Sequence, residues 1–159
     1  MRIPRLFTRA GESPYKGIAF KSLDIDICHA DPEQRCCIAD LQVPAHWSVE
    51  AAELLAQNYL LKSSVPLCLK AVDEPMVPHW LRRRVADESL LSALPKSERY
   101  GAETAAKDAF HRIAGAWAYW GFKRGYFDTE SDARAFYDET CYMLAMQMCA
   151  PSSPIWFNT

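Results

Sequence analysis

The chain has 159 residues, half of them apolar, with 18 basic and 20 acidic side chains and a formal charge of −2. This composition excludes an intrinsically disordered chain and a collagen-like one, and the length fits one domain with a hydrophobic core. A near-neutral charge gives no overall field that would draw the chain onto nucleic acid or an anionic membrane. A complete catalytic barrel, which needs about 250 residues, does not fit into this length.

The first residues are basic, but no apolar stretch of signal-peptide length follows them, and none reaches the roughly 18 apolar residues that span a bilayer. We therefore expect a cytoplasmic protein with no membrane partner, whose six cysteines are reduced thiols. A zinc site is the alternative use of some of them. Neighbouring residues on a strand point to opposite faces, which favours small buried thiols over zinc. The zinc alternative involves Cys28, His29, Cys36, Cys37 and His46.

The N-terminal third is expected to hold an arm and a small β element. Residues 1–17 contain glycine, serine and proline and are expected to be irregular. Apolar and acidic residues alternate from Leu23 to Ile27, and a second alternation ends at Pro44. A period of two predicts half-buried strands, so residues 18–44 are expected to form a β-hairpin or two paired strands around a turn at 31–34.

Residues 47–150 are expected to be mainly helical. Ser48 is a candidate N-cap for a helix from Val49 to about Lys62, and a loop rich in proline follows it. A short helix within 80–94 is expected to begin at Asp87. A longer one over 106–120 ends near Gly121, and the last runs from the capping box at 129–132 to Pro151. The fold class is therefore mainly α, a single helical domain over 1–159 with a small N-terminal β-hairpin or paired strands.

Helical spacing predicts one apolar stripe on each of the last two helices and a packed aromatic core between them. His111 lies beside the first stripe, where a local hydrogen bond to Asp108 accounts for it better than a catalytic pair. The stripe residues are Ala106, Phe110, Ile113, Trp117 and Trp120, then Ala133, Tyr137, Cys141, Leu144 and Met148. The aromatic residues are Trp117, Tyr119, Trp120, Phe122, Tyr126 and Phe127.

Two segments are candidates for binding phosphate. The basic run 82–84 follows Trp80 and is a candidate for contacting RNA, although a solvated helix start with Trp80 packed inward explains it better. In the segment 151–159, Pro151 and Pro154 bracket two serines and are expected to hold the backbone extended. Hydroxyl and N–H groups held in this way can bind phosphate, while a frayed tail is the simpler interpretation.

Several strings of residues resemble the N-terminal domain of class II, adenosylcobalamin-dependent ribonucleotide reductases. The resemblance runs in order along essentially the whole chain, and its aromatic and proline-containing strings are unusual compositions. The strings are Arg5-Leu-Phe-Thr-Arg, Val43-Pro-Ala-His-Trp-Ser, Glu98-Arg-Tyr-Gly, Ala114-Gly-Ala-Trp-Ala-Tyr-Trp-Gly and Ala150-Pro-Ser-Ser-Pro-Ile-Trp-Phe-Asn-Thr.

The resemblance implies a module that precedes a ten-stranded α/β barrel in a ribonucleoside-diphosphate reductase. In that family a radical generated by adenosylcobalamin passes to a cysteine of the barrel, and thioredoxin-like donors restore the redox dithiol. By this resemblance Ser153 helps to hold the substrate phosphates in an intact enzyme, and residues 151–159 lead into the absent barrel. No cysteine of this chain matches a catalytic position of the family, so neither a catalytic residue nor adenosylcobalamin bound to this chain alone is expected.

The chain departs from the family pattern at Ser152, where Asn is usual, and at Ile155, where Gln is usual. The alternative to an inactive module is a free-standing helical binding or regulatory domain. An exposed apolar patch near residues 155–157 would favour the module, and a polar surface there would favour the free-standing domain. Binding of nucleic acid through Arg82, Arg83 and Arg84 is a third and weaker hypothesis.

Overall fold

The N-terminal β element is an antiparallel pair of strands beside a helix. The computed structural model describes residues 1–27 and 36–159. Strand β1 (Phe20–Ile27) pairs with β2 (Cys36–Pro44), with a register shift between Leu23 and Ile25. The predicted paired strands are thus confirmed, and the turn expected at 31–34 lies outside the described residues. Ile25, Leu41 and Val43 point into the core, as the period of two requires.

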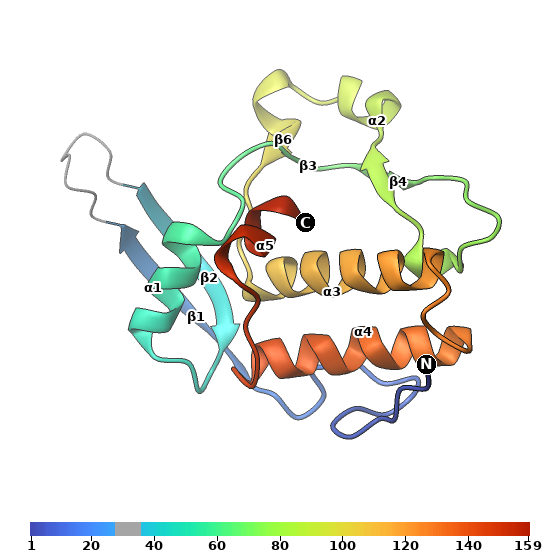
Figure 1. Ribbon diagram of the computed structural model, residues 1–159. Coiled ribbons are helices and arrows are strands. Elements are labelled where there is room, and N and C mark those ends of the chain that lie inside the picture. Colours follow the sequence, from blue (N-terminus) through green and yellow to red (C-terminus); the bar gives the residue numbers. More distant parts are fainter. Residues whose placement is uncertain (28–35) are drawn as a thin grey trace.

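Helix α1 (Val49–Asn58) covers this strand pair (Figure 1). The predicted cap is confirmed, because the side chain of Ser48 accepts a hydrogen bond from the backbone N–H of Ala51. Buried Leu55 and Ala56 face the core, while the neighbouring Leu54 is exposed. The helix ends at Asn58, four residues before the predicted Lys62.

The segment between α1 and α3 folds into short strands that the sequence did not predict. Strand β3 pairs antiparallel with β6, and β4 pairs antiparallel with β5. The expected short helix is present as α2, with Asp87 as its N-cap, and two single-turn 3₁₀ helices separate these elements. The bounds are β3 Val65–Pro66, β4 Leu69–Ala71, η2 His79–Leu81, β5 Arg84–Ala86, α2 Glu88–Ser92, η3 Lys96–Glu98 and β6 Tyr100–Gly101.

Helices α3 (Ala106–Lys123) and α4 (Glu130–Ala145) lie side by side and carry most of the core (Figure 1). Phe110, Ile113 and Cys141 are fully buried between them. Thr129 caps α4 as predicted, since its hydroxyl accepts a hydrogen bond from the N–H of Asp132. The mainly helical fold with a small N-terminal strand pair is therefore confirmed.

The predicted ends of these two helices are wrong. Helix α4 stops at Ala145, five residues before Ala150, because Gln147 adopts a φ of 56°. The N–H of Met148 then donates to the carbonyl of Met143, and that of Gln147 to Leu144, which is a Schellman motif. Met148 consequently leaves the predicted stripe and is exposed.

Helix α3 ends in the same motif, with Gly125 at a φ of 68° in the left-handed position. Gly121, the predicted helix end, instead lies inside α3 and is buried. A Cβ added at Gly121 would lie 2.7 Å from Cε2 of Phe127, so the glycine permits close packing of that ring. Trp120 and Tyr126 are 47% and 53% exposed, so the prediction that they belong to the aromatic core is wrong.

The N-terminal arm is fixed along α4, although it contains neither helix nor strand. The carboxylate of Glu139 accepts hydrogen bonds from the N–H groups of Phe7 and Thr8 and from the Thr8 hydroxyl. Arg5 pairs with the buried carboxylate of Asp138 at 2.8 Å. Burial alone would raise the pKa of Glu139, but the hydrogen bonds from Thr8 and its neighbours hold it below its usual value.

Candidate functional site

The C-terminal segment returns over α1 and α3 and ends in a short helix. Helix α5 (Ser153–Asn158) begins after Ser152 and contains Pro154 in its first turn. The predicted extended backbone is therefore wrong, because the fixed φ of proline also suits the first turn of a helix. Ser152 and Ser153 are both exposed at this end of α5.

Trp156 anchors α5 in the core. Its side chain is only 7% exposed, and its Nε1 donates a hydrogen bond to the carbonyl oxygen of Pro151 at 3.1 Å. Its ring lies against Tyr59, with ring centroids 4.9 Å apart. The segment is thus an ordered, packed part of the domain and not a frayed tail. Of the exposed apolar patch expected at 155–157, Trp156 is instead buried and Ile155 is half-buried. The side chain of Phe157 lies outside the described residues.

Arg112 of α3 ties this segment to two other parts of the chain. Its Nη1 donates to the carbonyl oxygens of Trp156 and Thr159, at 2.6 and 3.2 Å. Its Nη2 donates to the carbonyl oxygen of Tyr59 at 3.1 Å. A planar guanidinium with five donors suits such a junction, because several acceptors can be bound from fixed directions.

The charge of Arg112 is balanced by the buried carboxylate of Glu103, which is 7% exposed. Nε and Nη2 of Arg112 lie 2.8 and 3.0 Å from the two carboxylate oxygens. Glu103 also accepts a hydrogen bond from the N–H of Leu61 at 2.9 Å. The pair therefore fixes α3, α5 and the chain after α1 relative to one another, and no local sequence pattern predicts it.

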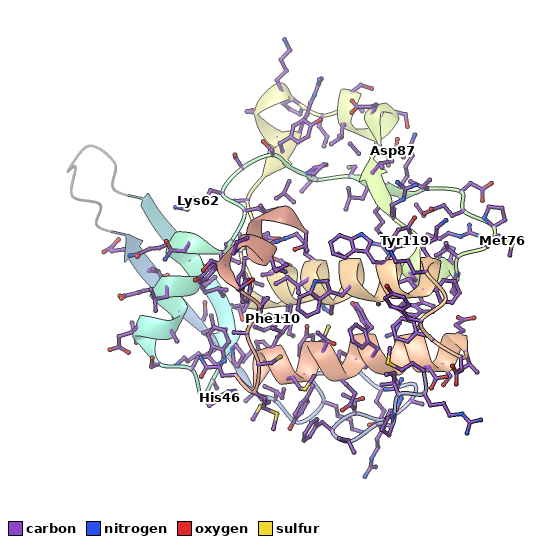
Figure 2. All side chains as sticks on the ribbon, in the orientation of Figure 1. His46, Lys62, Met76, Asp87, Phe110 and Tyr119 are labelled. Atoms are coloured by element: carbon purple, nitrogen blue, oxygen red, sulfur yellow. The ribbon has the colours of Figure 1, made fainter. Side chains whose placement is uncertain are left out.

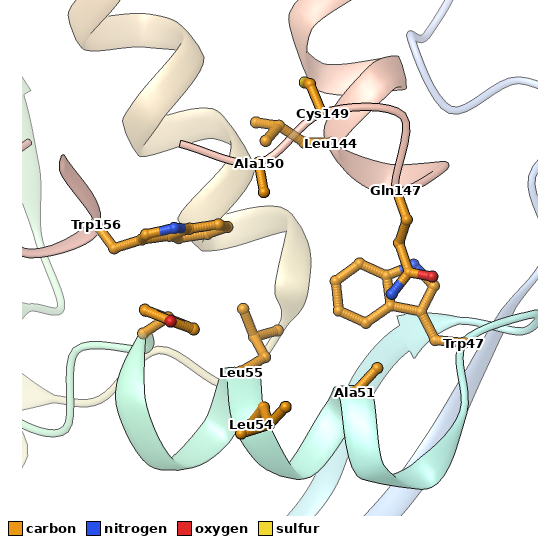
Figure 3. Close-up of a pocket in the computed structure, with 10 residues that line it drawn as sticks. Trp47, Ala51, Leu54, Leu55, Leu144, Gln147, Cys149, Ala150 and Trp156 are labelled. Atoms are coloured by element: carbon orange, nitrogen blue, oxygen red, sulfur yellow. The ribbon is translucent and has the colours of Figure 1, made fainter. Parts of the chain in front are cut away.

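An apolar pocket of about 300 Å³ lies beside this junction. Trp47 and Trp156 stand on opposite sides of it, and Leu54 and Leu55 of α1 form its floor (Figure 3). Cys149 and Ala150 cover another side, and Pro151 separates them from the two exposed serines. Its volume lies at the lower end of the range of small-molecule sites, and its lining offers little polar chemistry.

His111 lies on the other side of α3 from this segment. Its Nδ1 is 2.5 Å from the hydroxyl of Tyr137 and 3.7 Å from Sγ of Cys141. The expected bond to Asp108 is wrong, because Asp108 instead accepts from the N–H groups of Thr104 and Ala105 at the start of α3. Burial lowers the pKa of His111 and raises that of the Cys141 thiol to about 12.

The basic run 82–84, the other candidate for binding phosphate, is largely neutralised by neighbouring carboxylates. Arg82 and Arg83 pair with Asp73 and Glu74, whereas Arg84 has no such partner among the described side chains. Trp80 is half-buried against Tyr137, in line with the structural interpretation of that run.

Four residues of the zinc alternative lie where the structure does not describe the side chains, at 28, 29, 36 and 37. Over the rest of the chain, no group of three or more His, Cys, Asp or Glu residues is placed to hold a metal ion. No helix in the described part is both long and apolar enough to cross a membrane.

Comparison with known proteins gives one consistent family. The sequence model of class II vitamin B12-dependent ribonucleotide reductases matches residues 24–147. The chain is 52% identical over all 159 residues to a vitamin B12-dependent ribonucleotide reductase of Agrobacterium fabrum, and covers 12% of that protein. It is 50% identical over its whole length to one of Bradyrhizobium diazoefficiens, of which it covers 13%. One of Streptomyces coelicolor is 24% identical over 163 residues.

Proposed function

Because the chain belongs to the family of class II, vitamin B12-dependent ribonucleotide reductases, we propose that it acts as the N-terminal module of a ribonucleoside-diphosphate reductase. Such an enzyme converts ribonucleotides into deoxyribonucleotides for DNA synthesis. The observation that carries the proposal is the 52% identity over the whole chain to a relative of which the chain covers only 12%. The catalytic barrel, the thioredoxin-like reductant site and the nucleotide pocket would then lie in the remaining part of the enzyme.

The cofactor and the redox chemistry are assigned to that remaining part. Adenosylcobalamin supplies the radical that starts the reaction in this family. The apolar pocket of about 300 Å³ gathers no cluster of charged or metal-binding side chains, so its lining does not fit this large polar cofactor. Cys141 is buried and its pKa is raised to about 12, so it is a poor source of the thiolate that dithiol exchange needs.

The contribution proposed for this chain is to position residues that meet the substrate. Ser153, by family resemblance, would donate a hydrogen bond to a phosphate of the ribonucleoside diphosphate. The contacts of Trp156 and Arg112 support this role, because they fix the backbone on one side of the exposed Ser153. A serine held in this way loses less conformational entropy when it binds. We place the reaction in the cytoplasm, where reduced thiols persist.

The role of Ser153 is tested in the complete reductase that contains this chain. Ser153→Ala should raise the KM for the ribonucleoside diphosphate about tenfold, the usual effect of losing one hydrogen bond to a charged group, with a smaller change in kcat. Ser152→Asn, which restores the residue usual in the family, should leave both constants unchanged. Equal kinetics for Ser153→Ala and the parent enzyme would refute the assignment.

A further inference from the structure

The segment between α1 and α3 has almost no core of its own. We call residues 65–101, which contain β3, β4, β5 and β6, the β lobe. It is attached to α3 at one end, where Val77 and Leu81 pack on Ala118. There the hydroxyl of Tyr119 also donates to the carboxylate of Glu74 at 2.6 Å. Apart from Val77 and Leu81 at this attachment, Leu91 is the one large apolar side chain that is buried in the described part of the lobe.

The strand pair β4–β5 of the β lobe is largely uncovered. All three residues of β4 are exposed, and so are the first two of β5. Leu69 pairs with Ala86 and Lys70 with Val85, so Leu69 and Val85 lie on opposite faces of one ribbon. They are 46% and 45% exposed, so both faces of the ribbon are open.

Exposed apolar side chains are concentrated on this lobe, and Met76 stands at its outer edge (Figure 2). Two-stranded ribbons are marginally stable in water unless something packs against them, and grouped apolar side chains mark interaction surfaces. These exposed side chains of the lobe are Leu67, Leu69, Met76, Val85, Leu90 and Tyr100, with exposed fractions of 67%, 46%, 85%, 45%, 56% and 47%.

The C-terminal residue is held close to the end of the β lobe, because Arg112 binds both its carbonyl oxygen and the carboxylate of Glu103, which lies two residues after β6. In the view of Figure 1, the end of α5 lies on the side of α3 that carries the β lobe, away from α4. Arg112 fixes it there through the carbonyl oxygen of Thr159. The relatives from Agrobacterium and Bradyrhizobium continue far beyond the region matched by this chain, which covers 12% and 13% of them. In these relatives, the polypeptide after the matched region therefore starts beside the β lobe. Because it is covalently attached there, its local concentration at the lobe is high.

We propose that the β lobe is the docking surface for the polypeptide that follows the matched region in the relatives. Leu67 and Leu69 are the central contacts, because both are exposed and they follow directly on β3, the strand that pairs with β6 two residues before Glu103. This inference rests on the proposed function and adds to it the face of the module that meets the rest of the enzyme.

Hydrogen–deuterium exchange on two samples tests this proposal, namely the chain alone and the complete reductase that contains it. Backbone amides of 65–71 and 99–101 should exchange at least tenfold more slowly in the complete reductase, while those of α1 should exchange equally in both. The double variant Leu67→Glu/Leu69→Glu should remove this protection in the complete enzyme. Its matched control is Val49→Glu/Leu54→Glu, two residues of α1 that are 47% and 57% exposed.

The outcomes separate this inference from the proposed function. Equal exchange of the lobe in both samples, with a reductase that needs this chain for activity, would overturn the docking surface alone. Protection that appears in the isolated chain and rises with its concentration would show that a second copy covers the lobe, and would overturn it too. If the double variant of the isolated chain does not keep its circular dichroism spectrum, the single variant Leu67→Ser replaces it and should halve the protection or more.

Discussion

The guanidinium of Arg112 binds the buried carboxylate of Glu103 through two nitrogen atoms, at 2.8 and 3.0 Å. The two residues are nine positions apart, and Glu103 precedes the helix that carries Arg112. Through this pair, the end of α5, the chain after α1 and the middle of α3 share one polar junction. The position of the exposed serines therefore depends on a residue that does not contact them.

Arg112→Ala should destabilise the domain by about 3 kcal/mol, because it leaves the Glu103 carboxylate buried without its partner. The free energy of unfolding in urea measures this loss, and faster amide exchange at 155–159 should accompany it. Arg124→Ala, at an exposed arginine just after α3, is the control and should change stability by less than about 0.5 kcal/mol. Similar stabilities for the two variants would contradict the role of the junction.

Gly121→Ala should destabilise the domain by about 1–3 kcal/mol through overpacking, although alanine favours helices. The added methyl group would lie 2.7 Å from Cε2 of Phe127, and the ring would have to move. At Gly115, in the same helix, the corresponding distance to Tyr137 is 3.9 Å, an ordinary contact. Gly115→Ala should therefore stabilise the domain or leave it unchanged, and thermal unfolding of both variants checks the difference in sign.

His111 should make the domain less stable in mild acid. Burial lowers its pKa in the folded state, and Lys107 and Arg134 act in the same direction against the opposing charge of Asp108. The unfolded chain then binds a proton near pH 6.5 that the folded chain resists, so stability falls as the pH decreases from about 6.5 toward the lower folded pKa. His111→Gln should flatten the unfolding free energy between pH 7 and about 5, and an unchanged slope would contradict the assignment.

Cys141 should resist alkylation in the folded protein. Its thiol is buried, and with a pKa of about 12 only about one part in ten thousand is thiolate at pH 8. Mass spectrometry after iodoacetamide treatment should show Cys68 and Cys149, both half-buried, modified well before Cys141. Modification of Cys141 at the rate of Cys68 without unfolding would show that this part of the core opens.

The features predicted correctly from the sequence are those set by local chemistry. Alternation around Ile25 and Leu41 places both in the core because a strand has a period of two. Ser48, Asp87 and Thr129 cap helices because short polar side chains bond the first free N–H groups. These signals lie within a few residues of the structure they determine.

The features that were missed depend on residues far apart in the chain. Val65 pairs with Gly101 to form a ribbon of two residues per strand, which leaves no periodic signal in either segment. Gln147 ends α4 in a left-handed conformation that glycine usually adopts, so the sequence offered no marker there. For the candidate site, family resemblance identified Ser153, but no local pattern joined Glu103 to Arg112 and through it to the C-terminal segment.

Reconstitution of ribonucleotide reduction distinguishes a required module from an active enzyme and from a free-standing domain. The assay contains adenosylcobalamin, a dithiol and a ribonucleoside diphosphate, with this chain alone, with the complete reductase that includes it, and with that reductase lacking residues 1–159. For a required but inactive module, deoxyribonucleotide should form only with the complete enzyme. Product formation by the chain alone, or full activity of the shortened enzyme as expected for a free-standing regulatory domain, would contradict it.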